Sequence, residues 1–338
     1  MKIIRTHILS WKHFNADLFR ILRLLTPARI GNWILLEGSY RLSKLTGKIT
    51  HLGMPVAFSV ESSALCNLKC PECFIGSNRL LRPKGLLYVG LFRSVIEQTR
   101  EKSLWIQLHF QGEPFLNPSL TEMISFAAQH KMYTSISTNG HFLTQKISND
   151  ITEAGLDRII ISLDGIDQET YETYRKNGNF SQVAEGIRTL VQVRRKKKVY
   201  HPLIVIQFLV FNHNQHQMQQ AEKLAKQMGA DLFSVKTPQI LNPSSPGGVR
   251  PASGKWSRYS GKKQHPFHNV CHRMWASPVV TWDGFLLPCC FDKNAVYSFG
   301  NLNQSSFYEL WKGNKARQFR RKVFNHSAPP DICMNCIE

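Results

Sequence analysis

The stretch Cys66-Asn67-Leu68-Lys69-Cys70-Pro71-Glu72-Cys73 places three cysteines at the spacing C-x3-C-x2-C. It directly follows Val56 to Ser62, an apolar run that predicts a strand. Three thiolates suit an iron-sulfur cubane better than a closed zinc site, because structural zinc takes four protein ligands. A [4Fe-4S] cluster has four irons, so three cysteines leave one iron free to bind another molecule. The sequence therefore predicts a cluster with one open iron on these three cysteines.

From residue 56 to about residue 237, short apolar runs alternate with helical segments roughly every 25 residues. This alternation predicts βα units around a parallel sheet. The predicted strands are Val56 to Ser62, Trp105 to Phe110, Tyr133 to Ser137, Arg158 to Leu163, Leu203 to Phe211 and Leu232 to Lys236. The predicted helices between them span residues 89–101, 119–130, 144–154, 180–196 and 217–228. Six units are too few for an eight-stranded barrel.

The cysteine spacing, with the aromatic Phe74 after the third cysteine, resembles the signature of the radical S-adenosylmethionine (radical SAM) enzymes. Glu72 is a mild departure, because that position is usually apolar or aromatic in the family. The resemblance implies an α/β fold, a partial (β/α)6 TIM-like barrel with its ligands at the C-terminal ends of the strands. It also implies that the open iron binds the amino and carboxylate groups of S-adenosyl-L-methionine.

Three short segments fall at predicted strand ends and resemble family segments that contact this cofactor. Gln111-Gly112-Glu113-Pro114 resembles the family's Gly-Gly-Glu-Pro motif, and Glu113 can accept a charge-assisted hydrogen bond from the cofactor ammonium. The other two segments are Thr138-Asn139-Gly140 and Ser162-Leu163-Asp164-Gly165. The resemblance gives the cofactor-binding residues as Gln111, Gly112, Glu113, Pro114, Asn139, Ser162 and Asp164. For any one segment alone, the alternative is ordinary turn chemistry.

A second group of cysteines lies near the C-terminus. Its first half reads C-x12-G-x4-C around Gly284 and resembles the start of the SPASM domain, the auxiliary-cluster module of many radical SAM enzymes. The resemblance implies one auxiliary [4Fe-4S] cluster, as in the shortened twitch variant, on Cys271, Cys289, Cys333 and Cys336. Cys290 could replace Cys289, which is preferred because the resemblance places it there. The alternative is a structural zinc site with four cysteine ligands.

Residues 238–270 are rich in proline, glycine and serine, which predicts a linker or loop. Beyond it, Asp283-Gly284 lies between two apolar runs and predicts a β-hairpin, because its turn needs residues that tolerate positive φ. A last helix is predicted over Phe307 to Phe324. These features divide the chain into a helical extension (1–50), the core barrel (51–237), the linker (238–270) and the auxiliary cluster domain (271–338).

The N-terminal extension is apolar and basic, with a helical period. One stripe carries Trp11, Phe14, Leu18, Ile21, Leu22 and Leu25. Pro27 ends this helix, and Ile30 to Leu45 predicts a second one. A basic amphipathic helix of this kind suits a peripheral contact with a membrane. Packing against the body of the protein is the favoured interpretation, because apolar stripes usually face a core.

The protein has 338 residues and a formal net charge of +20 at pH 7. This length allows a full core and about two domains. The basic residues are partly concentrated in Arg194–Lys198 and Arg317–Lys322, where solvated helix ends are favoured over a specific anionic partner. Eight cysteines without a signal peptide indicate reduced thiols and a cytoplasmic protein. No run of about 18 apolar residues predicts a transmembrane helix.

The family resemblance implies that S-adenosylmethionine is cleaved reductively to a 5′-deoxyadenosyl radical, which abstracts hydrogen from a substrate. Four thiolates would close the auxiliary cluster, so its expected role is electron transfer in the net oxidation of a small molecule such as a sugar-like alcohol. The expected partners are that small molecule or a peptide, and a flavodoxin- or ferredoxin-type electron donor; no nucleic acid is expected. One alternative is a peptide- or protein-modifying SPASM maturase. The other is a non-catalytic, metal-stabilised protein that binds RNA or an anionic surface.

Overall fold

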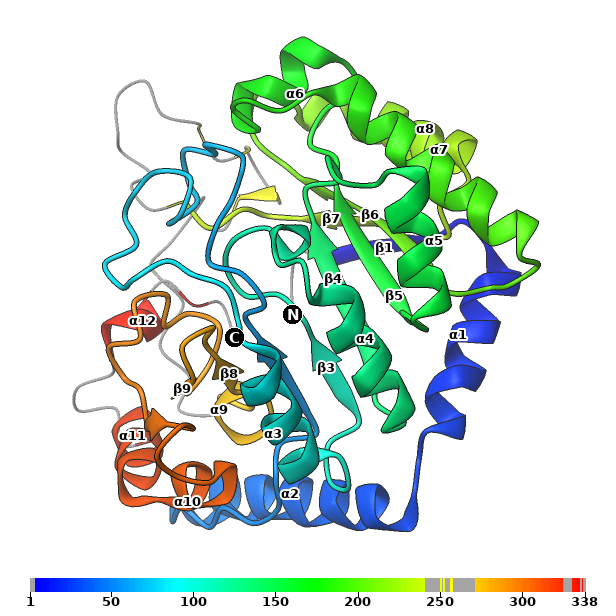
Figure 1. The fold of residues 1–338 in the computed structure, drawn as a ribbon. Helices are drawn as coiled ribbons and strands as arrows, with labels where there is room; N and C mark the ends of the chain where they lie inside the picture. The colour runs from blue at the N-terminus through cyan, green and yellow to red at the C-terminus, as the bar shows by residue number, and fades with distance from the viewer. Residues whose placement is uncertain are drawn as a thin grey trace. The chain divides into compact units, whose positions relative to one another are not determined.

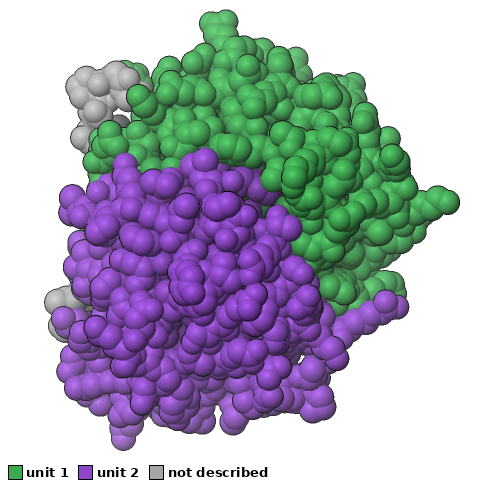
Figure 2. Space-filling view, in the orientation of Figure 1, with its two compact units in different colours: residues 1–21, 66–79, 135–262 green, residues 22–65, 80–134, 263–338 purple. Residues whose placement is uncertain are grey.

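The computed structural model describes residues 4–240, 250, 252, 256–257, 271–324, 330–334 and 336. They form a mixed α/β fold with largely parallel strands, which confirms the predicted class (Figure 1). The chain divides into two compact units (Figure 2). Unit 1 comprises residues 1–21, 66–79 and 135–262, and unit 2 comprises residues 22–65, 80–134 and 263–338. Each unit joins segments that are distant in sequence, so these divisions differ from the predicted domain boundaries.

Unit 1 is built on five strands in the order β1, β7, β6, β5, β4. Their bounds are β1 Ile4–Ile8, β4 Tyr133–Thr138, β5 Arg158–Ser162, β6 Leu203–Leu209 and β7 Leu232–Lys236, and the first two residues of β4 belong to unit 2. β1 runs antiparallel to β7, and all the other neighbours are parallel. The β6 sequence Leu-Ile-Val-Ile-Gln-Phe-Leu is apolar almost throughout, as expected for a parallel strand that is covered on both faces.

The helices of unit 1 include α5, α7 and α8, which lie along the sheet (Figure 1). The bounds are α1 Trp11–Arg23, α5 Gln145–Glu153, α6 Gln168–Tyr174, α7 Phe180–Lys196, η2 Gln215–Gln217 and α8 Met218–Met228; α1 ends in unit 2. Asn179 caps α7 by accepting the N–H of Gln182 at 2.9 Å. α7 buries Ile187 and Leu190 completely, and each buried side chain of this size stabilises the fold by about 1.5–3 kcal/mol.

Unit 2 has the strand order β3, β2, β8, β9, β10. The strands are β2 Ala57–Val60, β3 Trp105–Gln107, β8 Val279–Val280, β9 Phe285–Leu287 and β10 Gly300–Asn301. The helices are α2 Pro27–Thr46, α3 Val89–Thr99, η1 Pro114–Leu116, α4 Leu120–Gln129, α9 Arg273–Ala276, α10 Phe307–Lys312, α11 Asn314–Phe324 and α12 Asp331–Met334. β8 pairs in parallel with β2, so the predicted hairpin of β8 and β9 extends the sheet of the core region.

The structure confirms the six predicted strands and the five helices between them, apart from residues at their ends. Two other expectations were wrong. The predicted helix Phe307 to Phe324 is interrupted by Gly313, whose backbone is extended at φ −67° and ψ 174°. The N-terminal extension is not wholly helical, because β1 precedes α1. A five-residue strand with mixed polar and apolar side chains gives too short a pattern to stand out.

Helix α2 buries polar side chains along one stripe, made of Arg29, Asn32, Ser39 and Ser43 together with Leu36. The Asn32 amide donates to the carbonyl oxygens of Met54 and Lys102, each at 3.0 Å. The guanidinium of Arg29 donates to the carbonyl oxygens of Leu24 and Lys131, both at 2.6 Å, and of Arg100 at 2.7 Å. Buried polar groups are retained where such bonds satisfy them. The packed face of α2 is therefore its polar face.

The apolar side chains of the N-terminal helices point largely to solvent. Trp11 and Leu22 of α1 are 66% and 50% exposed, and Ile34 and Leu45 of α2 are 56% and 84% exposed. For Trp11 and Leu22, which belong to the predicted stripe, the favoured prediction of packing against the protein body was wrong. Phe14 of the same stripe packs against a buried cluster, as predicted. Within the part of the chain that the structure describes, no helix is both long and apolar enough to cross a membrane.

Candidate active site

The first cysteine motif lies in unit 1 on an irregular loop, residues 66–79. Hydrogen-bonded turns shape this loop. The N–H of Cys73 donates to the Cys70 oxygen at 3.2 Å, and the N–H of Ser77 donates to the Cys73 oxygen at 2.9 Å. Gly76 packs directly against the backbone of Cys70. A Cβ at this position would lie 2.6 Å from the Cys70 nitrogen, so only glycine fits without opening the loop.

The three thiols gather at one apolar cluster. Cys70 is buried there with Leu68, Tyr174 and Phe211, and Cys66 and Cys73 pack against the same group. Burial raises the pKa of the Cys70 thiol, and nearby Arg175 only partly offsets this effect. A metal must therefore displace a proton to bind Cys70. Three soft thiolates on one compact loop fit an iron-sulfur cluster with an open iron.

Asn139, at the end of β4, reaches the cysteine loop. Its side-chain N–H donates to Asn67 Oδ1 at 2.7 Å, and its Nδ2 lies 4.0 Å from the Cys66 sulfur. Its Oδ1 accepts the backbone N–H of His141 at 3.1 Å. The structure thus brings a predicted cofactor-binding residue beside the first cysteine.

Arg175 is a site residue that the sequence analysis missed. Its Nε donates to Asp164 Oδ2 at 2.6 Å, and its Nη1 lies 3.9 Å from the Cys70 sulfur. Burial lowers the pKa of Arg175, but the Asp164 carboxylate outweighs this and holds the pKa well above its ordinary value. The other oxygen of Asp164 accepts the N–H of Leu209 at 2.7 Å. Asp164, predicted to contact the cofactor, therefore orients a cation beside a cysteine.

Ser162 lies at the end of β5, opposite Gln207 of β6 in the parallel register. It is buried, like the neighbouring Asp164. Asn139 therefore follows β4, and Ser162 and Asp164 lie at the end of β5, in the unit that also carries the cysteine loop.

The predicted segment Gln111–Pro114 belongs to unit 2, where it follows β3. Glu113 is buried; its N–H donates to the Leu65 oxygen at 2.7 Å, and its carboxylate accepts the N–H of Phe115 at 3.3 Å. Gly112 has φ +71°, and a Cβ there would lie 2.4 Å from the Ser63 oxygen. This segment therefore braces the backbone that leads into the first cysteine.

Gly112→Ala is expected to destabilise the protein by about 1–3 kcal/mol, because it combines a left-handed backbone with a clash against fixed backbone atoms. Urea denaturation would measure the change. Gly38→Ala is the matched control, since nothing lies within 4 Å of a Cβ at that position of α2 and alanine favours a helix. Equal loss of stability in the two variants would contradict the assigned role of Gly112.

The second group of cysteines lies in unit 2, near the β8–β9 hairpin. Burial, followed by the neighbouring Cys290, Cys271 and Cys333, raises the pKa of the Cys289 thiol well above its ordinary value. Burial and the neighbouring Cys271 and Cys336 raise the pKa of Cys333 to about 12. These mutual effects place Cys271, Cys289 and Cys333 near one another, and Cys336 near Cys333. Such a set of thiols fits a fully ligated iron-sulfur cluster.

Family models match both parts of this arrangement. Residues 60–224 match the Radical SAM superfamily, and residues 271–337 match SPASM, an iron-sulfur cluster-binding domain. The chain is a radical SAM enzyme with a C-terminal SPASM domain. S-adenosylmethionine and iron-sulfur clusters are accordingly its cofactors. The match to an enzyme superfamily disfavours the alternative of a non-catalytic binding protein.

Two curated proteins and two solved structures illustrate the similarity. The tungsten-containing aldehyde ferredoxin oxidoreductase cofactor-modifying protein of Pyrococcus furiosus is 22% identical over 311 residues, which cover 82% of this chain and 86% of that protein. The AdoMet-dependent heme synthase of Methanosarcina barkeri is 28% identical over 182 residues, 54% of this chain and 50% of that protein.

The structure of BtrN in complex with AdoMet and 2-DOIA has a TM-score of 0.51 at 19% identity and covers 84% of this chain and 94% of BtrN. Streptococcus suis SuiB bound to S-adenosylmethionine has a TM-score of 0.63 at 12% identity and covers 89% of this chain and 75% of SuiB. At these levels of identity, the two structures support the fold.

Proposed function

We propose that Cys66, Cys70 and Cys73 hold the [4Fe-4S] cluster at which S-adenosylmethionine is cleaved. When bound, the reduced cluster supplies the electron that cleaves S-adenosylmethionine to a 5′-deoxyadenosyl radical, which abstracts hydrogen from the substrate. The gathering of the three thiols in one apolar cluster is the observation that carries this assignment. The protein's own part is to orient the reactants and to exclude side reactions. Anaerobic assays with dithionite would test it by measuring 5′-deoxyadenosine.

We assign the cofactor contacts to two sets of residues. The first set is Asn139 and Ser162, together with Asp164, which acts through Arg175, to which it is hydrogen bonded. The segment Gln111–Pro114 provides the second set, in which Glu113 accepts a charge-assisted hydrogen bond from the cofactor ammonium.

The proposed net reaction is the oxidation of a small molecule, such as a sugar-like alcohol. Removing a hydrogen atom leaves a substrate radical that must still lose one electron and one proton. The proton passes to solvent, and the thiols of Cys271, Cys289, Cys333 and Cys336 suit a cluster that takes the electron. The names of the two curated relatives, which refer to cofactor modification and to heme synthesis, also support a small-molecule substrate. Incubation with fractionated small-molecule extract should give a product that lacks two hydrogens, in equal amount with 5′-deoxyadenosine.

A peptide substrate is the second candidate. It is favoured by the similarity to SuiB, one structure of which is bound to the precursor peptide SuiA. A mass shift in a co-expressed peptide, with no oxidised small molecule formed, would favour this candidate over the first.

Cys289→Ala is expected to lower the iron content by about half, because it removes one ligand of the auxiliary cluster. Cys290→Ala is the matched control and should keep its iron. In the structure, burial and then neighbouring cysteines, Cys271 and Cys333 among them, raise the pKa of the Cys289 thiol. The Cys290 sulfur lies 3.3 Å from Arg273 Nη1. The opposite pattern of iron loss in anaerobically purified protein would make Cys290 the ligand.

Two further partners belong to this proposal. The first is a flavodoxin- or ferredoxin-type protein that delivers the reducing electron. The second is a membrane, which the N-terminal helices contact peripherally. Exposed Trp11 and Phe19 of α1, together with basic Lys12 and Arg23, support such a contact.

A further inference from the structure

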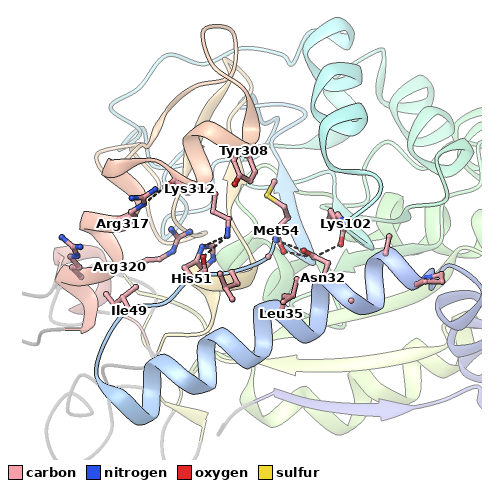
Figure 3. Close-up of a pocket in the computed structure, with 16 residues that line it drawn as sticks. Asn32, Leu35, Ile49, His51, Met54, Lys102, Tyr308, Lys312, Arg317 and Arg320 are labelled. Atoms are coloured by element: carbon pink, nitrogen blue, oxygen red, sulfur yellow. Dashed lines mark hydrogen bonds between the residues drawn. The ribbon is translucent and has the colours of Figure 1, made fainter.

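Unit 2 contains a pocket of about 750 Å³ that is unrelated to the cysteine motifs (Figure 3). Helix α2 and the segment after it form one side of the pocket, and α10 and α11 form another. None of its 16 lining residues is a cysteine or a predicted cofactor-binding residue. The basic stretch Arg317–Lys322, which the proposed chemistry does not use, supplies three of them.

One wall of the pocket is cationic. It carries Lys312, Arg317, Arg320 and Arg321. Arg320 is fully buried; its Nε and Nη1 donate to the carbonyl oxygens of Met274 and Trp311 at 3.2 and 3.1 Å. Its Nη2 is buried and has no hydrogen-bond partner among the described residues. A buried cation without a counter-charge is unfavourable, and an anion in the pocket would supply that counter-charge.

The groups around Arg320 do not neutralise its positive charge. Burial, Arg320 and Arg317 lower the pKa of Lys312 to about 8. Lys312 also donates to the His51 oxygen at 3.1 Å, and Lys312 and Arg320 converge on His51 (Figure 3). Burial and the same two cations lower the pKa of His51 to about 2, so this ring stays neutral at physiological pH. No carboxylate in the described ranges forms an ion pair with Lys312 or Arg320.

The other side of the pocket continues into the outward apolar face of α2. Leu35, 54% exposed, lines the pocket, and Leu52 lies close by in the same lining. Leu42 is two helical turns beyond Leu35 on the same flank, and Ile34 and Leu45 lie farther round the exposed surface. A cationic recess bordered by exposed aliphatic side chains matches a molecule that has an anionic head and an apolar tail.

We propose that this face of unit 2 binds the surface of an anionic phospholipid bilayer, with one lipid phosphate in the pocket beside Lys312, Arg317 and Arg320. The apolar side chains of α2 then enter the boundary between headgroups and acyl chains. This inference rests on the peripheral membrane contact proposed above and adds the lipid headgroup and its site. The exposed aliphatic side chains favour a lipid over free phosphate or RNA, because neither of these buries aliphatic surface. The net charge of +20 complements an anionic membrane.

Flotation of the full-length protein with vesicles tests the proposal. The two vesicle types are phosphatidylcholine alone and phosphatidylcholine with phosphatidylglycerol. We expect the wild type to float preferentially with phosphatidylglycerol. Lys312→Gln/Arg317→Gln should weaken this binding roughly 25-fold, since each basic group near an anionic surface contributes about fivefold. Ile34→Ser/Leu45→Ser should also weaken it.

Lys223→Gln/Lys226→Gln is the matched control, because it removes two exposed charges from α8 in unit 1. If this control lost as much vesicle binding as Lys312→Gln/Arg317→Gln, diffuse electrostatic attraction rather than the pocket would explain the binding. That result would overturn the proposal. Equal flotation with both vesicle types would overturn the headgroup site but keep the membrane contact, and flotation with neither would overturn both. Iron content and 5′-deoxyadenosine formation are measured in the same variants. Both should stay at the wild-type level whatever the flotation result, so a failure of the membrane proposal is distinguished from a failure of the enzymatic assignment. Binding of inorganic phosphate without flotation would assign the pocket to a soluble anion.

Discussion

Cys70→Ala is expected to reduce the formation of 5′-deoxyadenosine from S-adenosylmethionine to background. Cys70 is the buried member of the three cysteines and packs at the centre of their apolar cluster. Without its thiolate, two ligands remain for a cluster that needs three, so the open iron is lost with the cluster. Liquid chromatography of anaerobic reactions with dithionite would measure the product.

The control for this prediction is Cys290→Ala, which removes a partly buried cysteine from unit 2. This variant should still form 5′-deoxyadenosine, because Cys290 is not assigned to either cluster. If Cys70→Ala retained cleavage at the wild-type rate, Cys70 would not be a ligand of this cluster.

Arg175→Gln is expected to destabilise the protein by about 3–5 kcal/mol, the usual loss when one partner of a buried ion pair is removed. Asp164 is completely buried and would lose the cation that it now pairs with. The same substitution removes the positive group 3.9 Å from the Cys70 sulfur. Urea denaturation would measure stability, and iron analysis would report whether the cysteine loop still holds its cluster.

Arg188→Gln provides the comparison, since the Arg188 side chain is 49% exposed on unit 1 and its contact with Glu185 is 3.8 Å long. Such an exposed pair contributes less than about 1 kcal/mol. Arg175→Gln/Asp164→Asn should recover part of the stability, because it leaves no unpaired charge. Equal urea midpoints for Arg175→Gln and Arg188→Gln would show that the buried pair has no special role.

The sequence predicted the strands of the core because their signal is local. The runs Arg158–Ser162 and Leu203–Leu209 are rich in β-branched or large apolar residues, which mark buried parallel strands. The turn residues at the strand ends then predicted that Asn139 and Asp164 lie at the C-terminal ends of neighbouring strands. In the structure, Asn139 follows the last residue of β4 and its side chain donates to Asn67 of the cysteine loop.

The features that the sequence missed depend on long-range contacts. Arg175 follows Asp164 by 11 residues and forms no motif with it, so only the folded chain shows the ion pair. For α2, the period of the apolar residues identified a helix but not the face that packs. Hydrogen bonds from Arg29 and Asn32 to backbone oxygens bury the polar face and leave the apolar one outside.

Iron, sulfide and zinc per chain test the central claim most directly, in anaerobically reconstituted wild type and in a Cys66/Cys70/Cys73 triple alanine variant. One [4Fe-4S] cluster on each group of cysteines predicts about eight irons in the wild type and about four in the variant, with matching sulfide and no zinc. Unchanged iron in the variant would contradict the assignment of the first cluster. About four irons and one zinc in the wild type would make the C-terminal site structural and remove the proposed electron acceptor.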